Sequence, residues 1–206
     1  MSITYPLTWP TGVTPNRARW KPRTVVAVSE SPFTLVQQVY AWPGQGWAAE
    51  VDFPKLTRAQ GSAFLAFLLS LNGREGTFNF GDPVATTPRG TALGTPLVDG
   101  ASQTGAELAT KGWTATQTGV LLAGDYIQLG SGSTARLHRV LKNVNADGSG
   151  LATLDIWPDL RSSPADEATI TVSNTVGLFR LASNDMEWEL SLPDFHGFTL
   201  SITEAL

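Results

Sequence analysis

The sequence contains no cysteine, which excludes a disulfide framework, a thiol nucleophile and a thiolate metal site. Charged residues are also few, at 16% of the chain against about 25% in an average soluble domain. A surface with so little charge is common in proteins that bury much of their surface in an assembly. β proteins rich in Gly and Thr share this composition, so both explanations stay open.

Long hydrophobic runs and long basic runs are missing as well. No stretch of about 18 apolar residues exists, so no membrane insertion is expected. The first ten residues, MSITYPLTWP, lack the charged and apolar regions of a signal peptide. The densest basic stretch is residues 17–23 and the net charge is −4, which disfavours specific nucleic-acid binding. We expect a soluble protein made in a cytoplasm.

The residues that are abundant indicate β structure with many turns. The 206 residues include 20 Gly, 13 Pro and 7 Trp, and 42% are hydrophobic, enough to fill the core of one large or two small domains. Four prolines fall within residues 1–22 and fix the backbone there. We therefore expect an extended segment or loop at the start of the chain, with no regular strand except a short edge strand near residues 2–5.

Three strands are predicted next, at residues 24–29, 33–42 and 47–53. The first is rich in β-branched residues, and the third alternates apolar and polar side chains. Residues 43–46 (PGQG) are expected to form the turn between the second and third strands, which would then make an antiparallel hairpin.

One helix is predicted, over residues 57–72. Thr57 is a good N-cap, and Gln60 occupies the capping-box position. Four apolar side chains recur along one helical face: Phe64, Phe67, Leu68 and Leu71. Asn72-Gly73 ends the helix, and a short strand at residues 76–80 follows. A lone helix among strands needs a sheet to cover.

The composition changes after Pro83: large apolar residues become sparse, and Gly, Thr and Ala dominate. Short strands are predicted at residues 96–99, 106–110, 126–129, 135–143, 151–157 and 168–172. This number of short strands predicts a small β-barrel that resembles an OB-fold.

The end of the chain returns to amphipathic strands, at residues 186–192 and 198–203, with a turn at residues 193–197. Their period and aromatic content match those of residues 47–53. The terminal hairpin is therefore expected to complete the first sheet, and the helical stripe is expected to contact Trp188 or Phe198.

Two domains follow from this pattern. Residues 1–83 and 176–206 are predicted to form one discontinuous β-sandwich domain with the covering helix. Residues 84–175 are predicted to form an inserted β-barrel domain. The overall fold class is mainly β.

The sequence gives no catalytic, cofactor or metal site. His138 is predicted on a strand and His196 in a turn, each without a nearby histidine, so structural or surface roles are favoured. Nucleophile-elbow, phosphate-loop and dinucleotide motifs are absent.

Three weaker patterns remain. Asn143, Asn145, Asp147 and Gly148 match the start of a calcium loop, but its last ligand position holds Leu154, with Asp155 one residue off. A polar hairpin turn explains these residues better.

Glu187 and Glu189 share one strand face and could form an acid and base pair, although a solvated or subunit-facing strand is favoured. Several aromatic residues could stack on sugars: Trp42, Trp47, Trp113 and Trp157. For Trp47, on an alternating strand, a core position is favoured.

Taken in order, several short motifs resemble the distal tail proteins of long, non-contractile-tailed bacteriophages. They are VDFP at residues 51–54, the helix ending in Leu71-Asn72-Gly73, GTF at 76–78, Asp82-Pro83, GDYIQLG at 124–130, IWPDLR at 156–161 and GLFRL at 177–181 with the final hairpin. The resemblance runs from about residue 20 to the end.

This resemblance implies a structural virion protein of the phage tail, assembled in the host cytoplasm. It implies a β-sandwich with one helix, repeated as a homohexameric ring that joins the tail tube to the host-recognition tip. Expected partners are other copies, the tail tube protein, the baseplate hub and the tape-measure protein. DNA would pass through the lumen without specific binding, with which a net charge of −4 per copy is compatible.

Two other functions stay open. In the first, the inserted domain is a carbohydrate-binding module for host-surface glycans. In the second, the protein is a β-rich glycan hydrolase that uses Glu187, Glu189, Asp125 and Asp155.

Overall fold

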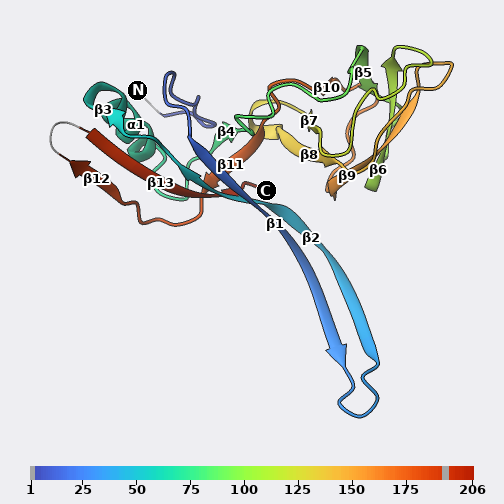
Figure 1. The fold of residues 1–206 in the computed structure, drawn as a ribbon, viewed down its shortest axis with the longest axis horizontal. Coiled ribbons are helices and arrows are strands. Elements are labelled where there is room, and N and C mark those ends of the chain that lie inside the picture. Colours follow the sequence, from blue (N-terminus) through green and yellow to red (C-terminus); the bar gives the residue numbers. More distant parts are fainter. Residues whose placement is uncertain (1–2, 192–194) are drawn as a thin grey trace.

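The computed structural model describes residues 3–191 and 195–206 (Figure 1). Over these residues the protein is mainly β, with two sheets and one α-helix, which confirms the predicted fold class. None of the described helices is both long and apolar enough to cross a membrane.

Seven strands form the first sheet. The main order is β1 (Arg17–Glu30), β2 (Gln37–Asp52), β13 (Phe195–Glu204), β11 (Gly177–Leu181) and β4 (Phe78–Phe80), while β3 (Leu56–Thr57) and β12 (Trp188–Ser191) also pair with β13. The pairing is antiparallel throughout. The chain leaves this sheet after β4 and returns to it at β11.

Six strands form the second sheet. Their order is β10 (Ile170–Thr171), β7 (Tyr126–Leu129), β8 (Arg136–Val140), β9 (Ala152–Leu160), β6 (Gly105–Trp113) and β5 (Gly94–Val98), with a short 3-10 helix η1 (Gly132–Thr134) between β7 and β8. The two end strands approach each other, because Val98 N donates to Ala168 O at 2.9 Å and Glu167 N donates to Val98 O at 3.0 Å. The sheet is therefore a nearly closed barrel.

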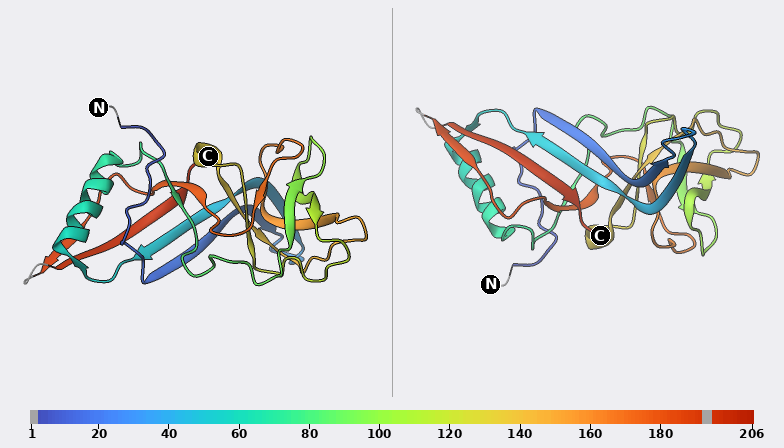
Figure 2. Two further views of the ribbon diagram at one scale, coloured as in Figure 1. Left: turned by 90° about the horizontal axis from the view of Figure 1, so that it is seen from above. Right: turned by 90° about the horizontal axis from the view of Figure 1, so that it is seen from below.

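The helix α1 (Arg58–Ser70) lies within the predicted range. The Thr57 backbone N–H donates to Oε1 of Gln60 at 3.2 Å, as expected for a capping box. Asn72 and Gly73 have φ values of 49° and 66°, so the chain turns away through the left-handed region directly after the helix. Viewed from above, α1 lies at one end of the molecule and β5 and β6 at the other, while β13 runs from the helical end toward the middle (Figure 2).

The apolar stripe of α1 covers the first sheet. Phe64 and Leu71 are fully buried, and the Phe64 ring lies 5.0 Å from that of Phe198 on β13. The contact predicted across more than a hundred residues is therefore present. Trp9 closes the same core, since its ring lies within 6 Å of the rings of Phe53, Phe64, Phe67, Phe78 and Phe80.

Two predictions about the β1–β2 hairpin were wrong, and the first concerns where its first strand begins. Apart from a short edge strand near residues 2–5, no regular strand was expected before residue 24, yet β1 begins at Arg17 and contains Pro22. Because β1 is the edge strand of its sheet, Pro22 can sit there without removing a ladder hydrogen bond from the interior of the sheet.

The turn predicted at residues 43–46 lies inside one long strand, β2. The pairing passes from Thr24 with Gln45 to Val25 with Trp42, so Pro43 and Gly44 are the extra residues of a β-bulge. A Cβ on Gly44 would lie 2.9 Å from Cγ2 of Val25, which explains the glycine. The hairpin turns instead at residues 31–36, where Ser31 N donates to Val36 O at 3.0 Å.

Most of the remaining strands lie close to their predicted positions. The predicted turn at residues 193–197 is an exception: residues 195–197 belong to β13, and residues 192–194 lie outside the described part of the chain.

The buried stripe yields a stability prediction. Phe64→Ala removes a ring that is 0% exposed, and we expect it to lower the free energy of unfolding by about 3–5 kcal/mol, measured by urea denaturation. Leu69→Ala, on the exposed side of the same helix at 57% exposure, should change it by less than about 0.5 kcal/mol. Equal losses would contradict the assignment of the buried face.

Candidate interaction surfaces

The outer part of the β1–β2 hairpin, residues 23–45, extends beyond the other strands of both sheets (Figure 1), and we call it the arm. Nine of the seventeen exposed large hydrophobic side chains of the described residues lie on it: Val25, Val26, Val28, Phe33, Leu35, Val36, Val39, Tyr40 and Trp42. They are more than half exposed, and Phe33 at the tip reaches 94%. Only Arg23 and Glu30 are charged in this segment.

Both faces of the arm are apolar. Val28 and its neighbour Val39 point to one face, while Ala27 and its partner Tyr40 point to the other. A two-stranded ribbon has no core of its own, and a large exposed apolar patch usually marks a contact surface. Among the described residues, the arm therefore carries most of the exposed large apolar side chains, and it is a candidate contact surface.

The base of the arm is fixed by a partly buried ion pair, which we call the junction. The carboxylate of Glu204, on β13, accepts hydrogen bonds from Nη1 and Nη2 of Arg161, both at 2.8 Å, and from the backbone N–H of Trp47 at 3.0 Å. The Arg161 guanidinium also donates to the backbone oxygen of Gln45, at 2.5 Å. One carboxylate thus joins β13, β2 and the segment after β9.

Aromatic side chains pack around this ion pair. Trp47 Nε1 donates to Leu137 O on β8 at 2.9 Å, and the ring of Trp157 on β9 meets that of Trp47 edge to face at 4.5 Å. The ring of Trp20, on β1, lies 5.5 Å from the ring of Trp47. The second sheet is therefore packed against the first at the point where the arm begins.

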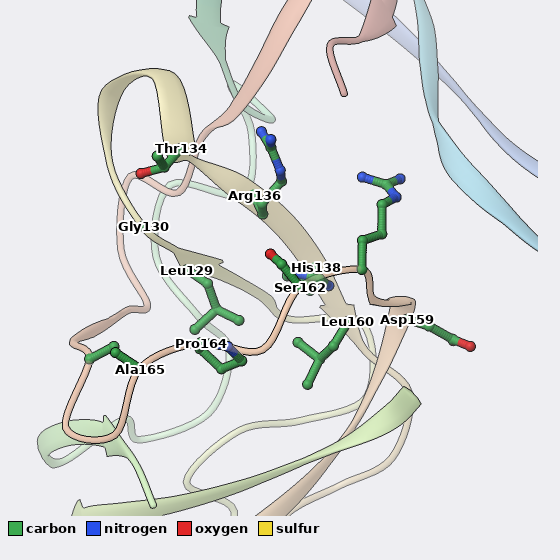
Figure 3. A pocket seen from close by; sticks show the side chains of 12 residues that line it. Leu129, Gly130, Thr134, Arg136, His138, Asp159, Leu160, Ser162, Pro164 and Ala165 are labelled. Carbon is green, nitrogen blue, oxygen red and sulfur yellow. The ribbon is translucent and has the colours of Figure 1, made fainter. Parts of the chain in front are cut away.

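A pocket of about 260 Å³ lies beside β8 and the segment that follows β9 (Figure 3), and we call it the β8 pocket. Leu129, Leu160 and Pro164 supply apolar lining, and Arg136 and His138 supply polar lining. His138 is 5% exposed, and its Nδ1 lies 2.6 Å from Pro158 O. Burial lowers the pKa of His138, so the imidazole is neutral at pH 7.

The partial calcium loop is a set of backbone caps. Asp147 Oδ1 accepts from the N–H groups of Ser149 and Leu151 at 2.8 and 2.9 Å, and these bonds lower the pKa of Asp147. Asn145 and Asn143 accept from the backbone of the loop before β7. The residues thus hold turns together, as the turn interpretation requires.

The four acidic residues of the hydrolase alternative lie in three different settings. Glu187 and Glu189 line an open hollow beside Asp52 at the end of the first sheet. Asp125 is buried next to β7, where its oxygens accept from the N–H groups of Arg89, Gly90 and Leu122 at 2.8–3.0 Å.

Asp155 pairs with Lys142 at 3.1 Å. Among the described residues, no group of three or more His, Asp or Glu side chains is placed to hold a metal ion.

Of the four tryptophans considered for sugar stacking, two are in the core. Trp47 is 3% exposed and Trp113 4%, and Trp157 packs on Trp47 as described. Trp42 is 54% exposed on the arm, where its ring lies 4.8 Å from that of Tyr40. The backbone of His196 lies in β13 rather than in the predicted turn.

Sequence patterns did not reveal the junction or the β8 pocket. Arg161 and Glu204 are 43 positions apart, and no local motif links them.

No protein-family model matches the chain, and a comparison with curated proteins finds no match.

The junction can be tested by removing one charge. Glu204→Gln leaves the Arg161 guanidinium without its anion, and we expect the free energy of unfolding to fall by about 1–3 kcal/mol in urea denaturation. Glu50→Gln is the matched control, because Glu50 pairs with exposed Arg19 and Lys21 and surface pairs contribute little. A larger loss in the control would contradict the role of the junction.

His138 predicts a pH dependence of stability. Its pKa is lowered in the folded protein, so the unfolded chain binds more protons just below pH 6.5 and the free energy of unfolding falls as pH falls through that range. We expect the drop in urea midpoint between pH 7.5 and 5.5 to be smaller in His138→Gln. The same drop in both proteins would contradict this, and His196→Gln serves as the control for loss of a histidine.

Proposed function

We propose that the chain is a structural subunit of a bacteriophage tail, similar to the distal tail proteins of long, non-contractile-tailed phages. In this proposal, copies assemble into a ring, most simply a hexamer, that joins the tail tube to the host-recognition tip. The observation that carries the proposal is the arm, an apolar ribbon held outside the folded body.

The body of the molecule does not need the arm for its own packing. The two hydrophobic cores are built from the two sheets, α1 and the N-terminal segment, and neither core includes a residue of the arm. An element of 23 residues with nine exposed large hydrophobic side chains is costly in a monomer. It is useful in a subunit that buries this surface against a neighbour.

The junction supports the same role. It fixes the base of the arm to both sheets through the Glu204 carboxylate, so the arm leaves the body in a defined direction. A pre-oriented contact element loses less conformational entropy on assembly than a flexible one. The choice of a phage tail ring as the particular assembly rests on the order of motifs that resembles distal tail proteins.

The proposed partners follow from that role. They are other copies of the chain, the tail tube protein, the baseplate hub and the tape-measure protein, all within the virion. DNA passes through the ring without specific binding. The low content of charged residues, 16%, suits a protein with large contact surfaces.

The arm can be tested with a paired substitution. Val28 and Val39 face each other across the hairpin, so Val28→Lys with Val39→Glu keeps a complementary pair while making that face polar. We expect ring formation to be lost and the thermal midpoint of the body to stay within a few degrees. Light scattering and negative-stain electron microscopy measure the first, and scanning calorimetry measures the second.

Leu69→Lys is the matched control, because Leu69 is an equally exposed apolar residue on α1, away from the arm. It should form rings as the parent protein does. A parent protein that stays monomeric at high concentration, alone and with the tail tube protein, would overturn the proposed function.

A further inference from the structure

We infer that Arg89 and Arg139 together bind a tetrahedral oxyanion, the phosphate group of a small phosphomonoester. Both side chains line a pocket of about 230 Å³ beside β7, which we call the Gly124 pocket. Arg89 lies in the segment between β4 and β5, Arg139 lies on β8, and Gly124 lies shortly before β7. This inference goes beyond the structural role and does not depend on ring formation.

The two guanidinium groups converge over the backbone of Gly124. A Cβ placed on Gly124 would lie 3.5 Å from Nη2 of Arg89 and 3.5 Å from Nη2 of Arg139. The distance between these two nitrogens therefore cannot exceed the sum of those two distances, so one small anion can reach both. Gly124 has a φ of 98°, which a residue with a side chain rarely adopts, and its glycine keeps the space between the two groups free.

Backbone oxygens hold both arginines in this position. Nη2 of Arg89 donates to Ala123 O, and Nε of Arg139 donates to Gly124 O at 3.1 Å. The Arg139 guanidinium also lies over the ring of Tyr126, 4.9 Å from its centre. Each guanidinium carries five N–H groups, so most of them stay available to a ligand. Because the two groups are already positioned, binding an anion costs them less conformational entropy.

The charges around the pocket favour an anion. Asp125 is the acidic residue that lines it, and its Oδ1 lies 3.6 Å from Nε of Arg89. The Asp125 side chain is only 2% exposed, and its oxygens already accept three backbone hydrogen bonds. Among the described residues, no carboxylate lies within ion-pair distance of Arg139. Two exposed guanidinium groups thus face one buried carboxylate, which leaves a positive charge for a ligand to neutralise.

Two guanidinium groups suit a phosphate better than a carboxylate. Each group can form two parallel hydrogen bonds with one anion. A carboxylate has two oxygens, which one such pair of bonds occupies, whereas a phosphomonoester has three free oxygens for the two groups to share. Val84, Pro88 and Val172 add apolar lining for the organic part of the ester. At about 230 Å³ the pocket is smaller than the usual 300–1,000 Å³ of ligand sites, which suits a small ester.

The test uses the full chain and two ligands, glycerol 1-phosphate and inorganic phosphate, with acetate as the carboxylate probe. Binding is measured by isothermal titration calorimetry at constant ionic strength. We expect glycerol 1-phosphate to bind at least about tenfold more tightly than acetate, because only the phosphate can bind both guanidinium groups. Failure of both phosphates to saturate at millimolar concentration, or equal binding of acetate, would overturn the inference.

A competition experiment separates a monoester from the phosphodiesters of nucleic acid. A short DNA duplex at the same total phosphate concentration should not displace glycerol 1-phosphate, because each of its phosphates has only two free oxygens. Displacement by the duplex would overturn the assignment to a monoester.

Substitutions locate the site. Arg89→Gln and Arg139→Gln should each weaken binding of glycerol 1-phosphate at least about tenfold. Arg58→Gln, which removes an exposed arginine of α1, should leave the affinity unchanged. Undiminished binding by either of the first two variants would place the phosphate elsewhere and overturn the assignment.

A last readout uses the unsubstituted protein, so that the result does not depend on the folding of a variant. The ¹⁵N resonances of the Arg89 and Arg139 side chains should both move as glycerol 1-phosphate is added. If either resonance is stationary at saturation, the shared site is wrong.

Discussion

The carboxylate of Glu204 is the point on which the arrangement of the molecule depends. It lies on the strand that joins β2 to β11, and it binds both nitrogens of the Arg161 fork and the backbone of Trp47. A carboxylate with 4% exposure of its side chain needs such partners, because burying an unpaired charge is costly. Satisfying it brings together the first sheet, the second sheet and the base of the arm. The geometry of all three is therefore coupled through one side chain.

Sequence patterns predicted the parts of the fold that rest on local periodicity. The helix was predicted because its signals, the capping residues Thr57 and Gln60 and the Phe64 stripe, involve only residues close together in the sequence. Strand β7 matched its prediction at Tyr126–Leu129. The arm was missed for a physical reason. Pro43 and Gly44 have the composition of a turn, but they are the extra residues of a bulge, and β2 pairs with β1 on both sides of them. Whether two segments pair as strands cannot be read from the sequence of either segment alone.

The candidate site was harder to predict than the fold. His138 was singled out as a residue, but its burial and its contact with Pro158 O on β9 come from the pairing of β8 with β9. Arg161 and Glu204 show no motif, since their contact is a product of the packing between sheets. Conversely, Asn143, Asn145 and Asp147 do show a motif, and the structure uses their oxygens for backbone caps. Oxygen-rich spacing alone does not distinguish a cation ligand from a turn.

The exposed apolar side chains of the arm make it prone to unspecific association when nothing covers them. Within the described residues, the outer edge of β1 pairs with no other strand, and a ribbon with a free edge and little charge is a template for indiscriminate edge-to-edge aggregation. Pro22 at the edge and the bulge at Pro43 interrupt that template at the base of the arm, and Glu30 places a charge near its tip. In the proposed ring, the same residues would therefore have to serve two opposed requirements: little exposed apolar surface before assembly, and much apolar surface to bury on assembly.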